Sequence, residues 1–261
     1  MKIREITTQI EDFAPLKYQE SYDNSGIQVG DVNQEVKGVL LCIDITEEVV
    51  DEAIRKGCNL IISHHPLIFG GIKKITPDTY IARTIIKAIE NHIVLYSSHT
   101  NMDKAPHGVN YQIAIKLGIN VEKMLEEEKD GSGFGLGIVG ELNEAEDALH
   151  FLERVKEIIH IGCIRHTEIP QGKKVKRIAL CGGSGFEFLP LAIREKADIY
   201  LTGDLKYHQF FEADGQTIIA DFGHFESEQF TKEIFYEIVS KNNANFATYF
   251  SDSKTNPINY I

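Results

Sequence analysis

Short hydrophobic runs alternate with amphipathic stretches along most of the chain. The runs at 59–63, 93–96 and 218–221 are four or five residues long and rich in aliphatic residues, which is typical of buried strands in a parallel sheet. Residues 1–13 instead place isoleucines three and four positions apart, and this spacing predicts an amphipathic helix. The alternation of the two patterns predicts an α/β protein.

One segment of this pattern occurs twice. Residues 36–65 align without a gap with residues 175–204, and each copy has the pattern strand, helix, strand. In the first copy Thr46 is suited to cap the helix and Gly57 to end it. The repeat predicts two similar domains, each containing a right-handed βαβ unit.

A stretch that combines charges with glycines separates the two copies. Residues 126–133 have the composition of a domain junction, so we expect a first domain at 1–126 and a second at 127–261. A further strand is predicted near 245–250. This strand could return to the first domain together with the segment at about 241–261.

Histidines and carboxylates follow three of the hydrophobic runs directly. In open α/β sheets, ligands bind beyond the carboxyl ends of the strands. Imidazole and carboxylate groups together bind zinc, manganese, iron or nickel, and a carboxylate can bridge two ions. Because the repeat could bring the strand ends of both domains to a shared cleft, we expect the metal site in the cleft between them. The residues concerned are His64 and His65, then His99 and Asp103, and then His224 and Glu228.

The charge balance argues against several functions. The 27 basic and 39 acidic residues give a formal net charge of −12, and there is no basic run, so a general nucleic-acid or anionic-membrane surface is not expected. No stretch reaches the length of a transmembrane span, and residues 1–13 lack the apolar core of a signal peptide. The four cysteines form no CxxC pair, which favours a reducing compartment. We therefore expect a cytoplasmic protein.

Five short motifs, in their order along the chain, resemble those of the Nif-three-like family, whose bacterial members are named GTP cyclohydrolase 1 type 2 homologues. The resemblance implies a dinuclear site built from His64, His65, Asp103, His224 and Glu228. It also implies a cleft between two similar α/β domains, and subunits that assemble into a toroidal homohexamer. The motifs are Asp23–Gly30, Ser63–Leu67, Ser98–Asp103, Leu201–Asp204 and Gly223–Glu228.

Several residues near these motifs are candidates for roles other than metal binding. The repeat equates His99 with His224, but the family's five-ligand set leaves His99 out, so we expect it either to support the metal ligands or to transfer a proton as a catalytic residue. His208, Asp204 and Asn24 are candidates for contacts with the substrate. The glycine-rich run 182–185 lacks the lysine and the spacing of a P-loop, and we interpret it as a turn.

The expected site favours hydrolysis. Two divalent ions per chain can lower the pKa of a bound water and polarise the group that it attacks. In a GTP cyclohydrolase this reaction opens the purine ring, an assignment that depends on the family resemblance alone. Two alternatives stay open: a metal-dependent phosphatase or phosphodiesterase acting on nucleotides, and a metal-binding interaction or regulatory protein without activity. The expected partners are further copies of the chain and a small-molecule substrate, GTP or another nucleotide.

Overall fold

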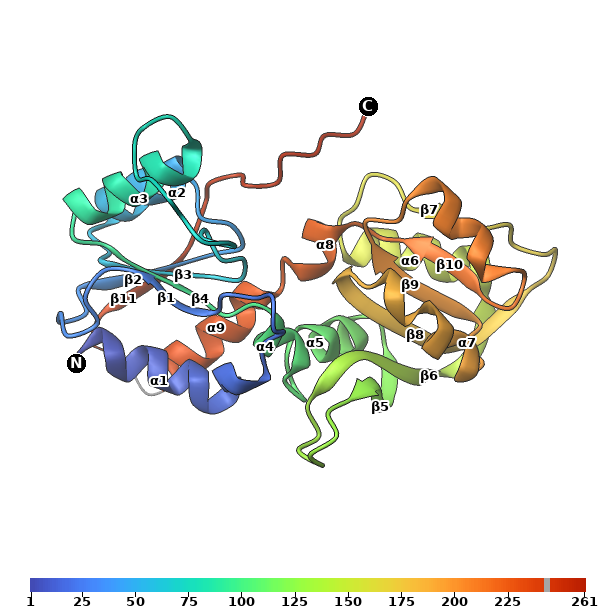
Figure 1. The fold of residues 1–261 in the computed structure, drawn as a ribbon. Coiled ribbons are helices and arrows are strands. Elements are labelled where there is room, and N and C mark those ends of the chain that lie inside the picture. The colour runs from blue at the N-terminus through green and yellow to red at the C-terminus, as the bar shows by residue number, and fades with distance from the viewer. Residues whose placement is uncertain (242–244) are drawn as a thin grey trace. The chain divides into compact units, whose positions relative to one another are not determined.

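The computed structural model describes residues 1–241 and 245–261, and the chain forms two compact units (Figure 1). The first unit comprises Met1–Met102 and Thr231–Ile258, and the second comprises Asp103–Phe230 and Asn259–Ile261. The division therefore falls at 102 instead of the expected 126, and the chain returns to the first unit at 231 instead of about 241. A sheet strand explains the first difference, because residues 119–127 pair within the sheet of the second unit.

A five-stranded sheet forms the centre of the first unit, in the order β1-β4-β3-β2-β11. The four strands from β4 to β11 are parallel, and β1 pairs antiparallel with β4. Helices α2 and α3 cover one face of the sheet, and α1 and α9 cover the other (Figure 1). The elements are α1 (Ile3–Phe13), β1 (Gly26–Val29), β2 (Gly38–Cys42), α2 (Glu47–Lys56), β3 (Leu60–Ser63), α3 (Tyr80–Glu90), β4 (Val94–Ser97), α9 (Thr231–Ser240) and β11 (Ala247–Phe250), with the 3₁₀ helix η1 (Leu16–Tyr18).

The second unit contains a six-stranded sheet in the order β5-β6-β8-β9-β10-β7. Strands β8, β9 and β10 are parallel, and the remaining pairs are antiparallel. Its elements are α5 (Val109–Lys116), β5 (Ile119–Glu127), β6 (Gly135–Asp147), α6 (Ala148–Ile158), β7 (Arg165–His166), β8 (Lys174–Ser184), α7 (Leu189–Arg194), β9 (Ile199–Gly203), β10 (Ile218–Asp221) and α8 (His224–Glu228), with the 3₁₀ helices η2 (Phe186–Phe188) and η3 (Tyr207–Ala213). The short helix α4 (Thr100–Lys104) contains the division between the two units.

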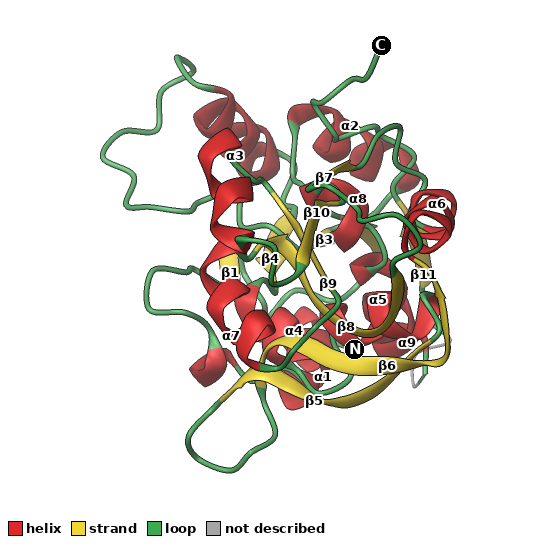
Figure 2. Cartoon of the chain, turned by 90° about the vertical axis from the view of Figure 1, so that its right-hand side faces the viewer, coloured by secondary structure: helices red, strands yellow, loops and turns green. Residues whose placement is uncertain are grey.

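The acidic and glycine-rich stretch at 126–133 covers the end of β5 and most of the hairpin turn that follows it. Strands β5 and β6 pair antiparallel on either side of it and run alongside one another in Figure 2. The main-chain amide of Glu128 donates to the carbonyl of Phe134, which closes the turn at 2.8 Å. The same composition that suits a linker therefore forms a loop within one sheet.

The two aligned segments both fold as strand, helix and parallel strand: β2-α2-β3 in the first unit and β8-α7-β9 in the second. In the first, Thr46 caps α2 by accepting from the amide of Val49, and Gly57 ends the helix with a φ of +70°. Aligned side chains also make the same contact. Asn59 accepts from the amide of Lys37 at 2.8 Å, and Asp198 accepts from the amide of Lys176 at 3.0 Å.

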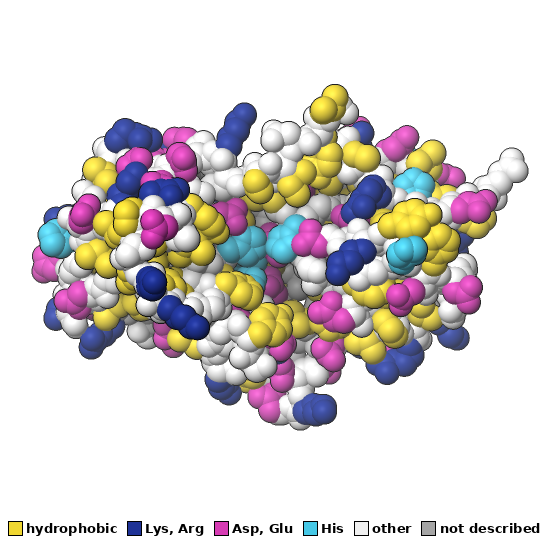
Figure 3. All heavy atoms as spheres, turned by 45° about the horizontal axis from the view of Figure 1, so that its top comes forward, with side chains coloured by type: hydrophobic (Ala, Val, Ile, Leu, Met, Phe, Trp, Pro, Cys, Tyr) yellow, Lys and Arg dark blue, Asp and Glu magenta, His cyan; other side chains and the backbone are white. Residues whose placement is uncertain are grey.

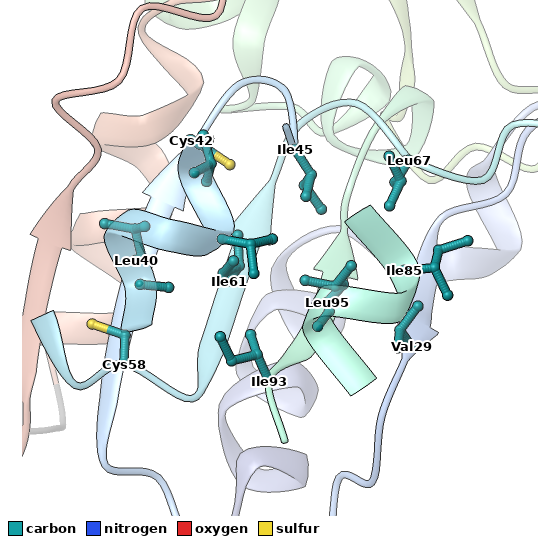
Figure 4. Close-up of a cluster of buried hydrophobic side chains, with 14 residues drawn as sticks. Val29, Leu40, Cys42, Ile45, Cys58, Ile61, Leu67, Ile85, Ile93 and Leu95 are labelled. Atoms are coloured by element: carbon teal, nitrogen blue, oxygen red, sulfur yellow. The ribbon is translucent and has the colours of Figure 1, made fainter. Parts of the chain in front are cut away.

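Each unit has its own hydrophobic core. In the first, side chains from β3, α3 and β4 meet between the sheet and the helices, with Ile61, Ile85 and Leu95 pointing into a common cluster (Figure 4). In the second, Tyr200 and Ile219 belong to a cluster that α7 covers. Burying such side chains contributes about 1.5–3 kcal/mol each.

A buried carboxylate attaches the returning C-terminal segment to the first unit. Glu52, on α2, is 2% exposed in its side chain and pairs with Lys56 at 2.7 Å. It also accepts from the hydroxyls of Ser251 and Ser253 at 2.6 and 2.7 Å, and from the amide of Asp252 at 2.9 Å. These contacts hold the chain just beyond β11, which pairs in parallel with β2.

Charged side chains are spread over the visible surface (Figure 3). Acidic and basic side chains are interspersed over the face that Figure 3 presents, and they do not gather into one basic area there. Among the residues that the structure describes, no helix combines the length and the apolar character needed to cross a bilayer.

Candidate metal centre

Three histidines of the first unit converge at the carboxyl ends of two neighbouring strands. His64 and His65 follow β3 and His99 follows β4, and these strands pair in parallel, so that their carboxyl ends lie at the same edge of the sheet. His64 is completely buried, whereas His65 and His99 are half-buried. The ring centroid of His64 lies 4.9 Å from that of His65 and 5.2 Å from that of His99. Each ring offers a nitrogen within 4.8 Å of the others, a spacing that suits one metal ion.

Hydrogen bonds fix the orientation of each imidazole through Nδ1. In His64 this atom donates to the main-chain carbonyl of Ser98 at 3.1 Å. In His65 it lies 2.7 Å from the carboxylate of Asp44, and in His99 it lies 2.8 Å from that of Asp23. A carbonyl or carboxylate oxygen can only accept, so the proton is assigned to Nδ1 and the lone pair to Nε2. This is the arrangement by which proteins orient metal-binding histidines.

The carboxylate of Asp23 is held by several hydrogen bonds. Its side chain is fully buried and accepts from the amide of Thr100 at 3.0 Å and from its hydroxyl at 2.5 Å, in addition to His99. Burial alone would raise the pKa of Asp23, but the hydrogen bonds and the charge of His99 outweigh it and hold the pKa well below its usual range. The carboxylate is therefore ionised and rigidly held beside His99.

The second unit brings an imidazole and two carboxylates together. His224 and Glu228 lie four residues apart on α8, and His224 Nε2 is 3.2 Å from the carboxylate of Glu228, whose side chain is 3% exposed. Asp103, on α4, offers an oxygen within 4.8 Å of one from Glu228. His224 Nδ1 is bound by the carboxylate of Asp204 at 2.8 Å. Its Nε2 is thereby directed toward Glu228.

The charges around His224 favour a cation at this point. Burial opposes protonation, but the charge of Glu228 and the hydrogen bond to Asp204 outweigh it and raise the pKa of His224 to about 11. A divalent ion satisfies the same two carboxylates and requires a neutral imidazole, so it would replace the proton on Nε2. The donor set of the second unit thus fits a metal ion.

Gly183 makes room for the carboxylate of Glu228. Its φ is +62°, and a Cβ at this position would lie 2.2 Å from Glu228 Oε1 and 3.5 Å from His224 Nε2. The Gly183 amide also donates to the hydroxyl of Ser227 at 3.0 Å. The run 182–185 is interpreted from the sequence as a turn, but residues 182–184 belong to β8, whose end lies against α8. Only glycine combines this conformation with this contact.

A family model decides the relationship of the chain to known proteins. The model of the family Duf34/NIF3 (NGG1p interacting factor 3) matches residues 1–257. The chain belongs to the Duf34/NIF3 family. This membership confirms the resemblance seen in the five motifs.

Similar Duf34/NIF3 proteins match most of the chain. A protein of Clostridium acetobutylicum is 37% identical over 87% of this chain and 85% of its own length, and one of Lactococcus lactis is 34% identical over 98% of both. Each is named a GTP cyclohydrolase 1 type 2 homolog. The crystal structure of a hypothetical protein of Staphylococcus aureus matches with a TM-score of 0.91 and 30% identity, covering 100% of this chain and 99% of that one. These likenesses confirm the predicted α/β class.

The three residues expected to contact a substrate make contacts of three different kinds in this Duf34/NIF3 protein. Asp204 is the carboxylate that holds His224. Asn24 donates to the carbonyl of Ile68 at 2.6 Å. His208 is exposed on η3, where its ring contacts those of Tyr207 and Phe211.

Sequence reasoning missed the two carboxylates that hold His65 and His99. Asp44 comes just after β2, so its place at the end of a predicted strand was an available signal. Asp23 lies in one of the five family motifs, and its contact with His99 joins residues 76 positions apart. That contact depends on the tertiary fold and leaves no local pattern.

A cavity of about 290 Å³ adjoins His65 on the first unit. Asp44 contributes to its wall and also accepts from the hydroxyl of Thr255 at 2.9 Å. Tyr80, at the start of α3, closes part of it. The complete lining is Asp44, Ile45, Thr46, His65, Pro66, Leu67, Tyr80, Thr255 and Pro257.

Proposed function

We propose that this Duf34/NIF3 protein is a hydrolase that depends on two divalent metal ions, held by ligands from both units. The proposed ligands are His64, His65, Asp103, His224 and Glu228. The observation that carries the proposal is the uniform treatment of the imidazoles, each oriented by a hydrogen bond at Nδ1 so that Nε2 is available to a metal. Histidines that served only to neutralise nearby carboxylates would not need this common orientation.

The donor sets of the two units are complementary. The first unit offers imidazoles, and the second adds Glu228 and Asp103, which supply the negative charge that two divalent ions require. Such a mixed set suits zinc, manganese, iron or nickel. When bound, the ions would lower the pKa of a water molecule toward neutrality and polarise the group under attack.

His99 is the residue that we propose for proton transfer. Its Nδ1 is bound to the buried carboxylate of Asp23, which keeps the ring in one orientation. A histidine held in this way can take up a proton at Nε2 and pass it on to a leaving group. Asp23 acts through His99, as a positioning residue.

The names of the relatives support a purine nucleotide as the substrate, because GTP cyclohydrolases open the purine ring of GTP. To test this, purified protein is loaded separately with Zn²⁺, Mn²⁺, Fe²⁺ or Ni²⁺ and incubated with GTP and with bis-p-nitrophenyl phosphate. Loss of the guanine absorbance is expected with one of the metals. Release of nitrophenol without ring opening would replace the cyclohydrolase by a phosphodiesterase.

A matched pair of variants distinguishes turnover at the proposed metal site from any metal-independent hydrolysis. Glu228→Gln is expected to abolish turnover, because it removes the charge of a proposed ligand. Glu153→Gln alters an exposed residue of α6 and should leave turnover unchanged. If neither substrate is turned over with any of the four metals, the protein is not the hydrolase proposed, and a metal-binding interaction role takes its place.

We also propose that the protein acts as a homohexamer, on the strength of its family membership. Light scattering should then give a mass near six times 29.4 kDa. A monomer at micromolar concentration would contradict this assembly.

A further inference from the structure

Two large aromatic side chains of the first unit are exposed beside the histidine cluster. The residues are Tyr22, which is 61% exposed, and Phe69, which is 51% exposed. Their rings are stacked, with centroids 6.4 Å apart and planes inclined by 28°. Exposed aromatic rings that lie together commonly mark recognition surfaces, because burying them against a ligand is favourable.

The aromatic pair is in direct contact with the candidate site. The ring of Phe69 meets that of His99 edge to face, at a centroid distance of 5.8 Å. The ring of His99 in turn lies 5.2 Å from that of His64 and 5.4 Å from that of His65. Phe69 is therefore separated from the metal-binding imidazoles by a single ring.

Three consecutive residues hold this arrangement. Tyr22 stacks on Phe69, Asp23 binds His99, and Asn24 donates to the carbonyl of Ile68, the residue before Phe69. Both main-chain polar groups of Ile68 are bonded, since its amide donates to Gln28 at 3.1 Å. One short segment thus fixes the aromatic pair and the proton-transfer histidine in a common frame.

We propose that Tyr22 and Phe69 bind the planar heteroaromatic ring of the substrate by stacking, and so place it beside His99. This inference rests on the proposed function, because it assigns the pair to the substrate of the same site. The two exposed rings are already inclined to each other by only 28°, so a planar ring can stack against them with little rearrangement. Stacking of this kind selects bases over sugars and phosphates.

Calorimetric titration of the full chain tests the pair without requiring turnover. The probes are guanosine 5′-monophosphate and ribose 5-phosphate, which differ by the base, and each is titrated with a divalent ion bound and in the presence of a chelator. The unmodified protein should bind the monophosphate at least about ten times more tightly than ribose 5-phosphate. Phe69→Ala and Tyr22→Ala should each weaken the monophosphate about 5- to 100-fold and leave ribose 5-phosphate unchanged. Phe69→Tyr should keep the affinity.

Two further variants test where the heteroaromatic ring of the monophosphate binds. Ile75→Ala removes another exposed apolar side chain, 52% exposed, from the segment between β3 and α3, and should have no effect. Tyr80→Ala alters the cavity beside His65. If Tyr80→Ala weakens the monophosphate and Phe69→Ala does not, the ring binds in that cavity and the inference is wrong. Equal affinity of the unmodified protein for both probes also overturns it, whereas a failure of hydrolysis with base-selective binding intact would refute only the proposed function.

Discussion

Both βαβ segments gather imidazole and carboxylate groups at the ends of their strands. The two segments differ in which aligned position carries the carboxylate. In the first, Asp44 holds His65, which ends the segment. In the second, the residue aligned with His65 is Asp204, a carboxylate that holds His224 from α8. The residue aligned with Asp44 is Gly183, and the carboxylate of Glu228 occupies the space beside it. A shared backbone thus determines where ligands gather, while the residue at each strand end determines which side supplies imidazole and which supplies carboxylate.

The largest predicted effect is on turnover, and it comes from comparing two similarly held histidines that we assign to different roles. His99 and His224 both follow strands and both have Nδ1 bound by a carboxylate, but Nε2 of His224 lies against Glu228. His99→Ala should keep both ions and lower turnover about 10²- to 10⁴-fold, the usual loss for a general acid. Metal content and rate are measured on one preparation. A variant that loses metal would make His99 a ligand instead.

The position aligned with Asp44 in the second segment is Gly183, and its role can be tested directly. In Gly183→Ala the new Cβ displaces the buried carboxylate of Glu228, so metal affinity should fall about 10- to 100-fold. The control is Gly172→Ala, which has a φ of +72° and no atom within 4 Å of the added Cβ. Both substitutions introduce about 1–2 kcal/mol of backbone strain, and only Gly183→Ala also introduces a steric clash. Unaltered metal affinity in Gly183→Ala would contradict the assigned contact.

The helices of the two segments show how far the sequence alone could be interpreted. Run length and caps predicted α2 and its flanking strands, and the ends of the strands predicted where ligands lie. Glu52 on α2 looks like an ordinary surface residue, because its burial depends on Ser251 and Ser253, about 200 positions away. The aligned residue on α7 is Leu191, which packs against the core of its own unit.

The hairpin at 126–133 escaped prediction for a similar reason. Charges and glycines are favoured in linkers and in hairpin turns alike, because both need solvated and flexible backbone. Only the pairing of β5 with β6 distinguishes the two, and this pairing is not visible in the composition of the turn.

The smallest effect concerns Glu52 and is dependent on pH. Burial raises its pKa, but hydrogen bonds from Lys56, Ser251, the Asp252 amide and Ser253 outweigh this and lower the pKa to about 2. Because the folded value lies below the ordinary value of 4.5, the stabilisation is complete above pH 4.5 and is lost as the pH falls toward 2. Glu52→Gln should lower the free energy of unfolding at pH 7 by about 1–3 kcal/mol.

Urea denaturation at pH 7, 4.5 and 3 measures this difference. The gap between the unmodified protein and Glu52→Gln should narrow as the pH falls, because protonation removes the charge that the variant already lacks. Leu191→Ala, at the aligned position, should give a loss that does not change with pH. A constant gap for Glu52→Gln would show that its carboxylate is not held as described.

The most direct test of a shared dinuclear site is the metal content of three proteins prepared without chelator. Elemental analysis of the unmodified chain should give two divalent ions per chain. His64→Ala, in the first unit, and His224→Ala, in the second, should each lose most of this metal although each retains the other unit's ligands. If either variant keeps two ions per chain, the two units do not share the site, and the central claim is refuted.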